Sequence, residues 1–358
     1  MSPPAPPAKV LIIKPSSLGD VISGLPVLGG LRRSFPKARL AWLVTPTCAG
    51  ILAGQPGLDE VIGFDRQRYG RIGRSPDAAR AFAAFCRELR RRRFDWVIDL
   101  QGLFRSAFLA GVTGAAVRAG FADAREFAPV FYTHPVRVSA GHTIDRNVEL
   151  ARGLGVDARP EDLRLHVADL AREFVDSILA AAGMKKGRYL LLAPGTRWRN
   201  KMYPPRHWKK VIAELAGQRP VVLAGTGQER PLCQELTEGN GRAVINLAGQ
   251  TTLPQLVALI ASAGGVVCCD SAAVFISAAV GTPLVMLAGP TRPERTGPYG
   301  GAARVLQADI PCIGCLKRRC RHVTCMQAIP PASVAVAARE ALGMADRPAA
   351  PRGKGADG

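Results

Sequence analysis

The chain alternates short apolar runs with longer amphipathic stretches. Four apolar runs in its first half are typical of buried strands: Val10–Ile13, Leu40–Val44, Val61–Phe64 and Trp96–Leu100. Apolar residues recur at helical spacing over three further stretches: Val21–Arg33, Ala78–Arg93 and Thr143–Leu154. The segment from Gly120 to His142 has neither periodicity and is predicted to be irregular. Strands that alternate with helices indicate a parallel sheet with helices on both faces.

A second alternating series begins at Tyr189. Its predicted strands are Leu190–Ala193, Val221–Ala224, Asn246–Ala248, Val266–Cys269 and Leu284–Leu287. Its predicted helices are Arg206–Ala216, Glu229–Glu238, Leu253–Ala263 and Ala272–Val280. Between the two series, Gly155 to Asp169 contains Pro160, charges and few large apolar residues, which is typical of a linker.

The two series predict an α/β protein of two Rossmann-like lobes, residues 9–160 and 170–345. Two such lobes form a cleft, and open α/β sheets bind ligands outside the carboxyl ends of their strands. The segments 1–8 and 347–358 are rich in Pro, Ala and Gly, and we expect them to be disordered.

The chain shows no sign of a membrane span or an export signal. Leu256 to Gly289 contains a single charge, Asp270, but glycines and Pro283 cut it into pieces of strand or short-helix length. Met1 to Ala8 lacks the charged and apolar regions of a secretory signal. We therefore expect a soluble, cytoplasmic protein whose nine cysteines are in a reducing compartment.

The charge balance indicates anionic partners. The 358 residues include 48 Lys and Arg against 28 Asp and Glu, a formal net charge of +20. Such a surplus suits a nucleotide, a phosphorylated lipid, an acidic membrane face or a nucleic acid. Arg90 to Arg93 closes a predicted helix and is interpreted as a solvated helix end rather than a nucleic-acid patch. No nucleic-acid motif is recognisable, so no nucleic-acid partner is expected.

The loop after the first predicted strand, Lys14 to Asp20, contains the first candidate for chemistry. Asp20 falls where a strand gives way to a helix, so it can act as a general base toward a hydroxyl. Gly19 allows close approach of a ligand to the backbone. The alternative is that Asp20 lies in the first turn of the helix and that Ser16 or Ser17 caps it.

Two loops of the second half resemble phosphate sites. Pro194 to Lys201 places three cations and Thr196 between a strand and a helix, although a solvated basic loop is an equal alternative. Asp270 follows a very apolar strand, where a carboxylate needs a partner or a ligand. The N–H groups from Ser271 to Ala273 favour an anion there, and helix capping by Asp270 is compatible with this.

Four cysteines lie within fourteen residues of one another: Cys312, Cys315, Cys320 and Cys325. Free thiols, a structural metal site and a disulfide are all open interpretations. The five scattered histidines include no His-x-x-x-His, so no catalytic metal is expected. The chain also has no P-loop pattern, no Gly-x-Gly-x-x-Gly after a strand and no Gly-x-Ser-x-Gly.

Several segments, in their order and spacing, resemble glycosyltransferase family 9, the bacterial ADP-heptose:lipopolysaccharide heptosyltransferases. These segments are Lys14–Ile22, Val97–Leu103, Ala124–Phe127, Lys201–Trp208, Asp270–Ser271, Gly289–Thr291 and Gly297–Gly300. The resemblance spans residues 9 to 330, and Gln101 to Leu103 favours the branch that extends the inner-core Kdo sugar, heptosyltransferase I.

The resemblance implies a GT-B fold with an acceptor lobe, a nucleotide-sugar lobe and inversion at the donor carbon. It also implies a reaction without cofactor or metal. It assigns the proton transfer to Asp20 and the neutralisation of the leaving diphosphate to Lys201. The donor-binding residues it implies are Thr196, Arg197, Lys201, Glu229, Asp270, Ser271 and Ala272, and the acceptor-binding residues are Ser17, Gly19 and Arg125. The expected partners are ADP-heptose and an anionic lipopolysaccharide precursor at the inner membrane face, where the enzyme binds peripherally.

The chain departs from the family pattern Asp-Ser/Thr-Gly-x-x-His, because Ala272 replaces the glycine and Phe275 the histidine. The four-cysteine run is similar to one in only part of the wider family. Two alternatives therefore stay open: a family 9 enzyme with another nucleotide-sugar donor, and a non-catalytic protein that binds a nucleotide-sugar or an anionic lipid.

Overall fold

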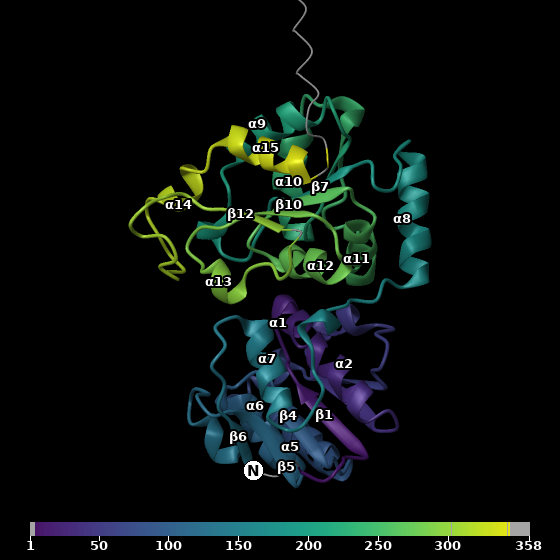
Figure 1. Cartoon of the computed structure of the whole chain (residues 1–358), viewed down its shortest axis with the longest axis vertical. Coiled ribbons are helices and arrows are strands. Elements are labelled where there is room, and N and C mark those ends of the chain that lie inside the picture. Colours follow the sequence, from purple (N-terminus) through teal and green to yellow (C-terminus); the bar gives the residue numbers. More distant parts are fainter. Residues whose placement is uncertain (1–3, 302, 342, 344–358) are drawn as a thin grey trace, which may run out of the picture.

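Both halves of the chain fold into the predicted alternation of strands and helices. The computed structural model describes residues 4–301, 303–341 and 343. Each half contains a parallel sheet of six strands, and the two lobes lie one above the other in Figure 1. The first sheet contains β1 Lys9–Ile13, β2 Arg39–Val44, β3 Glu60–Gly63, β4 Trp96–Asp99, β5 Val117–Phe121 and β6 His134–Val136. The second contains β7 Leu190–Ala193, β8 Val221–Leu223, β9 Val244–Asn246, β10 Gly265–Cys269, β11 Leu284–Leu287 and β12 Ala303–Leu306.

The two sheets have the same topology. The strand order is β3-β2-β1-β4-β5-β6 in the first and, read in the same sense, β9-β8-β7-β10-β11-β12 in the second. This is the doubly wound order, in which the connections reverse direction between the first and fourth strands of each sheet. The prediction of two Rossmann-like lobes is thereby confirmed.

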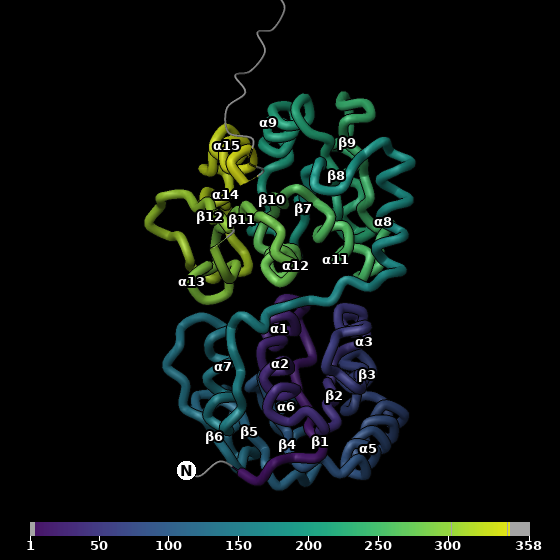
Figure 2. The backbone as a smooth tube through the Cα atoms, turned by 45° about the vertical axis from the view of Figure 1, so that its right-hand side comes forward, coloured from purple at the N-terminus to yellow at the C-terminus, as the bar shows by residue number. Residues whose placement is uncertain are grey.

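Helices cover both faces of each sheet (Figure 2). Those of the first lobe are α1 Leu18–Ser23, α2 Leu25–Ser34, α3 Pro46–Ala49, α4 Arg66–Tyr69, α5 Pro76–Arg91, α6 Phe104–Thr113 and α7 Thr143–Arg152. Those of the second are α8 Asp169–Ala181, α9 Pro205–Leu215, α10 Arg230–Thr237, α11 Leu253–Ala261, α12 Ala272–Val280, α13 Pro293–Thr296, α14 Thr324–Gln327 and α15 Pro331–Ala341. Single 3-10 turns are η1 Gly50–Leu52, η2 Ala128–Phe131, η3 Pro160–Asp162, η4 Arg199–Lys201, η5 Gly227–Glu229 and η6 Gly241–Ala243.

Strand residues alternate between two apolar cores in each lobe. In β1, Val10 and Ile12 pack with α1, α2 and α7, whereas Leu11 and Ile13 pack with α5 and α6. In the second lobe, α8, α11 and α12 cover one face, and α9, α10 and α15 cover the other. Because every strand in the middle of a sheet is buried on both faces, these strands have the continuous apolar runs that the sequence shows.

Several predicted boundaries are wrong. The single helix predicted over Val21–Arg33 is two helices that meet at Gly24, because Pro26 has no N–H with which to continue the hydrogen bonding of the first helix. The strand predicted over Asn246–Ala248 is Val244–Asn246. In the stretch predicted to be irregular, β5 ends at Phe121 and the edge strand β6 follows it.

The tails differ in part from the expectation of disorder. Residues 4–8 lie against the first sheet, where Trp96 Nε1 donates a hydrogen bond to the Ala5 carbonyl and the Ala8 N–H donates to Asp95. Residues 1–3 and 347–358 lie outside the described residues.

The lobes meet along the helices that follow their central strands. Helix α1 packs on α12, and η1 packs on α11 (Figures 1 and 2). Tyr299 of the second lobe donates a hydrogen bond to Asp145 of α7, and His142 Nε2 lies 3.3 Å from the Gly297 carbonyl oxygen. The apolar core is continuous across this interface.

Candidate active site

Four loops at the interface contain most of the predicted site residues. They follow β1, β4, β7 and β10, the central strands on either side of the reversal point in each sheet. In the first lobe Asp20 follows the loop after β1 and Asp99 ends β4, and in the second lobe the loops contain Thr196 and Asp270. The fold therefore directs the two halves of the predicted site toward the same interface.

Asp20 lies in the first turn of α1 and has two kinds of partner. Its Oδ2 atom accepts hydrogen bonds from the Ser17 N–H, at 2.8 Å, and from the Ser17 hydroxyl, at 2.7 Å. Its Oδ1 atom lies 4.0 Å from Lys14 Nζ, and the side chain is 40% exposed. Ser17 is thus the N-cap residue of α1 and Asp20 lies in its first turn, as the capping interpretation predicts, but the Ser17 hydroxyl donates to Asp20 and makes no cap hydrogen bond. A carboxylate has about four acceptor positions, however, so these contacts still leave room for a hydroxyl ligand.

A buried polar network lies behind Asp20. Lys14 Nζ donates a hydrogen bond to the Leu100 carbonyl at 2.5 Å, and Tyr132 Oη donates to Asp99 Oδ2 at 2.7 Å. Asp99 Oδ1 accepts from the N–H groups of Gln101 and Gly102. Burial lowers the pKa of Lys14, while the charges of Asp20 and Asp99 raise it in part. Burial also raises the pKa of Asp99.

In the second lobe, three of the predicted residues contact one another. Lys201 Nζ forms an ion pair with Asp270 Oδ2 at 2.7 Å, and both side chains are largely buried. The Thr196 hydroxyl donates a hydrogen bond to the Asp270 carbonyl at 3.0 Å. Asp270 thus holds the ammonium group beside the start of α12. Ser271 is the N-cap of that helix and makes no side-chain cap hydrogen bond, so the N–H groups of Ala272 and Ala273 are available to an anion.

The loop that presents Lys201 is supported by the cysteine segment. The Trp198 ring has Lys201 Nζ at 4.4 Å from its centre and the Arg318 guanidinium at 4.9 Å. Asn200 Nδ2 donates a hydrogen bond to the Lys317 carbonyl. The segment between Cys315 and Cys320 therefore fixes the loop that carries the cation.

Glu229 lies beside the same loop. Its carboxylate accepts hydrogen bonds from the N–H and hydroxyl of Thr226, at 2.6 and 3.1 Å. A Cβ on either Gly195 or Gly225 would collide with the Glu229 side chain. Only glycine at these two positions lets the carboxylate approach the ends of β7 and β8.

The two halves of the site come together where α1 meets α12. A Cβ on Gly19 would lie 2.5 Å from the Phe275 ring, so the backbone beside Asp20 is in contact with the first turns of α12. Phe275 stands where the family pattern has histidine, and in this chain it forms part of the contact between the lobes.

The remaining predicted residues have fewer contacts. Arg125 follows β5, and its backbone N–H donates to the Gly102 carbonyl at 3.2 Å, next to the Asp99 loop. Its side chain is exposed, as is that of Arg197. Ala272 begins α12. No contact between Arg125 and Asp20 is present in the described chain.

The four clustered cysteines are free thiols. Within residues 4–301, 303–341 and 343, no group of three or more His, Cys, Asp or Glu side chains is arranged to hold a metal ion. No disulfide joins any two of these four cysteines, so the structure does not support the disulfide interpretation. Burial raises the pKa of Cys325, and N–H groups of Val323 and His322 lower the pKa of Cys320.

The groups behind the site had no predicted role. Lys14 and Asp99 belong to quoted segments, and each lies at the polar end of an apolar strand, which is the signal that identifies them. Tyr132 and Trp198 had no such signal, because their roles depend on contacts with residues far away in the chain.

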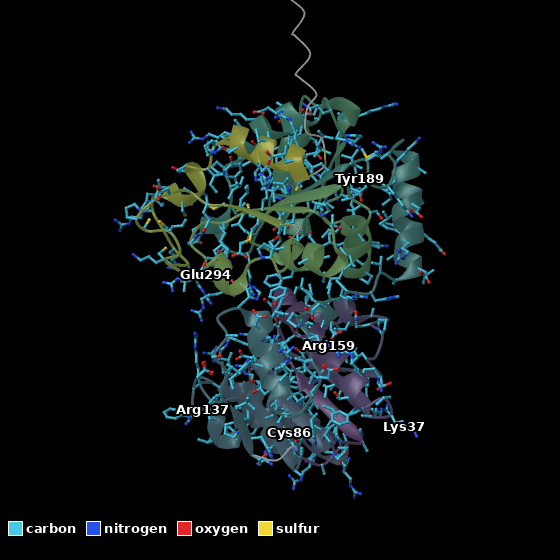
Figure 3. All side chains as sticks on the ribbon, viewed as in Figure 1. Lys37, Cys86, Arg137, Arg159, Tyr189 and Glu294 are labelled. Carbon is cyan, nitrogen blue, oxygen red and sulfur yellow. The ribbon has the colours of Figure 1, made fainter. Side chains whose placement is uncertain are left out.

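Some of the cations lie far from the interface between the lobes. Figure 3 shows Lys37 and Arg137 pointing away from opposite edges of the first lobe, far from the interface.

Among the described helices, none has both the length and the apolar composition that a membrane crossing requires.

Comparison with known proteins identifies relatives over most of the chain. The family model glycosyltransferase family 9 (heptosyltransferase) matches residues 82–325. Lipopolysaccharide heptosyltransferase 1 of Pseudomonas aeruginosa is 31% identical over 325 residues, which cover 88% of each chain. Lipopolysaccharide heptosyltransferase 1 of Escherichia coli K12 is 29% identical over 84% of this chain and 93% of its own.

Solved structures give the same result. The E. coli heptosyltransferase WaaC with ADP-2-deoxy-2-fluoro heptose has a TM-score of 0.76 and 25% identity, over 93% of this chain and 99% of its own. A family 9 glycosyltransferase from Veillonella parvula has a TM-score of 0.79 at 21% identity, over 94% and 97%. The chain therefore has the GT-B fold of these proteins.

Proposed function

The chain belongs to glycosyltransferase family 9, the heptosyltransferases, and from this premise we propose that it transfers heptose from ADP-heptose to the lipopolysaccharide inner core. The acceptor is Kdo-lipid A or the first heptose attached to it. The observation that supports this most directly is the pairing of sites across the interface: Asp20 on one lobe, and Lys201 with Asp270 on the other, at the contact between α1 and α12.

The proposed reaction is a single displacement with inversion. Asp20 accepts the proton of the acceptor hydroxyl, whose oxygen attacks the anomeric carbon of heptose from the side opposite the diphosphate. The bond from that carbon to the diphosphate oxygen breaks, and ADP leaves. Lys201, Thr196 and the N-terminus of α12 stabilise the charge that develops on ADP.

The other residues bind and orient the two substrates. Glu229 holds the ribose of the nucleotide, and Arg197 and Ser271 contribute to the diphosphate site. Arg125 binds an anionic group of the acceptor, together with the backbone around Ser17 and Gly19. The protein works in the cytoplasm, peripherally on the inner membrane face, because the acceptor is a lipid.

The decisive experiment measures ADP release from a panel of nucleotide-sugars, with and without Kdo-containing lipid A. We expect release from ADP-heptose that depends on the acceptor and is unchanged by a chelator. If the nucleoside diphosphate were released faster from another nucleotide-sugar, that sugar would take the place of heptose as the transferred group. Tight donor binding without turnover on any acceptor would favour the non-catalytic alternative, for which Phe275 in place of the family histidine is the motivating observation.

A further inference from the structure

The first lobe has a group of exposed apolar side chains that the proposed reaction does not use. Phe127 is 83% exposed, Val130 74%, Phe104 48% and Ile72 40%. They lie in the segments that follow the carboxyl ends of β5, β4 and β3, so they share one edge of the sheet with Asp20. We call these four residues the apolar rim. Burying large apolar groups in water-free surroundings is favourable, so their exposure together indicates a surface that something covers.

The apolar rim is continuous with an aromatic groove. The groove has a volume of about 420 Å³ and lies between α4, α5 and α6. Its apolar lining is Phe64, Tyr69, Ile72, Phe82, Phe104 and Phe108. The ring centre of Phe104 lies 5.5 Å from that of Phe131, and the Phe104 N–H donates to Glu126. These contacts join the groove to the turn that carries Phe127 and Val130.

Cations surround this apolar surface. The segment from Asp65 to Arg74 contains four arginines and one aspartate, and Arg105 lines the groove. Of these five arginines, only Arg68 forms an ion pair within the described part of the chain, with Asp77. The others are exposed cations beside exposed apolar groups. Stable attachment to a membrane needs this combination of an apolar insertion and an electrostatic attraction to anionic lipids.

We propose that the apolar rim docks on the surface of an anionic phospholipid bilayer. Its side chains enter the acyl layer, and the arginines of the Asp65–Arg74 segment and Arg105 meet the lipid phosphates. The inference rests on the proposed function in one respect: docking by this edge brings a membrane-anchored acceptor to the edge that carries Asp20. A protein partner is less consistent with the surface, because its unpaired arginines need a dense array of anions.

The test uses the full chain and vesicles of phosphatidylcholine alone or mixed with phosphatidylglycerol, with no acceptor lipid present. We expect binding to the anionic vesicles only. The variant Phe127→Asn/Val130→Asn should weaken binding by about tenfold or more, because it removes two inserted apolar groups. Asparagine suits position 127, where φ is +59°. Arg71→Gln and Arg74→Gln should each weaken it by about fivefold at low salt.

The matched control is Leu170→Gln, because Leu170 is 80% exposed on α8 of the other lobe. It should bind vesicles as the unchanged protein does. Melting temperatures of all variants exclude misfolding. Equal binding by the Phe127/Val130 variant and the Leu170 variant would overturn the proposal. A second outcome would also overturn it: the unchanged protein is a dimer, and the Phe127/Val130 variant is a monomer that still binds vesicles. A second copy of the chain, and not the bilayer, would then cover the rim.

The outcome separates docking from the reaction. With a water-soluble, deacylated acceptor, the Phe127/Val130 variant should keep the activity of the unchanged protein and lose it only when the acceptor is embedded in vesicles. Absence of turnover in every protein would contradict the proposed function, while the vesicle assay would still decide whether the rim docks on lipid.

Discussion

At the scale of single residues, Asp20 combines a structural and a chemical role. One of its oxygens caps the start of α1 through Ser17, and the other faces the buried Lys14 ammonium. Both contacts hold the carboxylate in one orientation, which is what a base at this position needs. The capping interpretation of Asp20 therefore explains how the side chain is held, and it leaves the proposed catalytic role intact.

The variant Asp20→Asn tests this role. The amide oxygen can still accept from the Ser17 N–H, so α1 should form as before. It cannot take up the proton, and transfer should fall by about 10²–10⁴-fold. Rates of ADP release measure the loss, while calorimetric titration with ADP should give an unchanged affinity. Turnover close to that of the unchanged protein would rule Asp20 out as the base.

Lys201 needs a test that separates its chemistry from its ion pair. Lys201→Met leaves the buried Asp270 carboxylate without its partner, at a cost of about 3–5 kcal/mol in the free energy of unfolding. The double variant Lys201→Met/Asp270→Asn removes both charges and should regain most of that stability. Transfer should stay at least about 10²-fold reduced in both. Denaturant unfolding and kcat are the two measurements, and recovery of kcat in the double variant would show that Lys201 acts only through stability.

At the scale of elements, the contact between α1 and α12 determines how closely the lobes approach. Gly19 has no side chain, and the Phe275 ring fills the space that a Cβ would occupy. Phe275, which stands in place of the histidine of the family pattern, packs between the lobes. Of the contacts between the lobes, this one lies beside Asp20, so it directly affects the distance between the base and the diphosphate site.

We expect Gly19→Ala to reduce transfer by about 10²-fold, because a shift of about 1 Å in positioning is enough for such a loss. The added methyl group would lie 2.5 Å from the Phe275 ring, so the ring, or α12 with it, must move. Gly19→Ala/Phe275→Ala makes room again and should be more active than Gly19→Ala alone. Steady-state rates of the unchanged protein, Gly19→Ala, Phe275→Ala and the double variant form a double-mutant cycle. If the effects of the two single substitutions on the activation free energy simply added up in the double variant, the two residues would not interact.

Much of the fold was predictable because buried parallel strands have continuous apolar runs. The bounds of β7, α12 and β11 agree with the prediction residue for residue. The two missed strands lack that signal: β12 is a half-exposed edge strand, and β6 has only three residues, one of which is Pro135. The site loops were predictable from their positions after central strands. The buried network around Asp99 was not, because Tyr132 reaches it from 33 residues away.

At the scale of the whole molecule, side chains of α7 fasten the two lobes together. His142 is the N-cap of α7: its Nδ1 accepts from the Ile144 N–H, and its Nε2 faces the Gly297 carbonyl. Its ring packs on Tyr299, whose hydroxyl donates to Asp145. Burial lowers the pKa of His142 below 6.5, although the Gly297 carbonyl and Asp145 oppose this in part.

This shift predicts a pH dependence of stability. The unfolded chain binds a proton at His142 more readily than the folded one, so the contribution is complete above pH 6.5. It is lost as the pH falls from there through the lower pKa of the folded state. The lost hydrogen bond from Ile144 corresponds to about 1 kcal/mol.

Denaturant unfolding between neutral and mildly acidic pH measures this effect. His142→Asn keeps a cap acceptor but does not titrate, so its free energy of unfolding should fall less in acid than that of the unchanged protein. His207, whose pKa burial also lowers, is present in both proteins and cancels in the comparison. If the free energy of unfolding changed with pH equally in both proteins, protonation of His142 would not weaken the contact between the lobes.

The shared strand order of the two sheets has an evolutionary consequence. The two lobes have the same topology, and in the proposed reaction the first lobe binds the acceptor and the second binds the nucleotide-sugar. Acceptor specificity and donor specificity can then evolve separately, provided that the packing of Phe275 against Gly19 is kept. Hybrid proteins that combine the first lobe of one relative with the second lobe of another should show the acceptor specificity of the first parent and the donor specificity of the second.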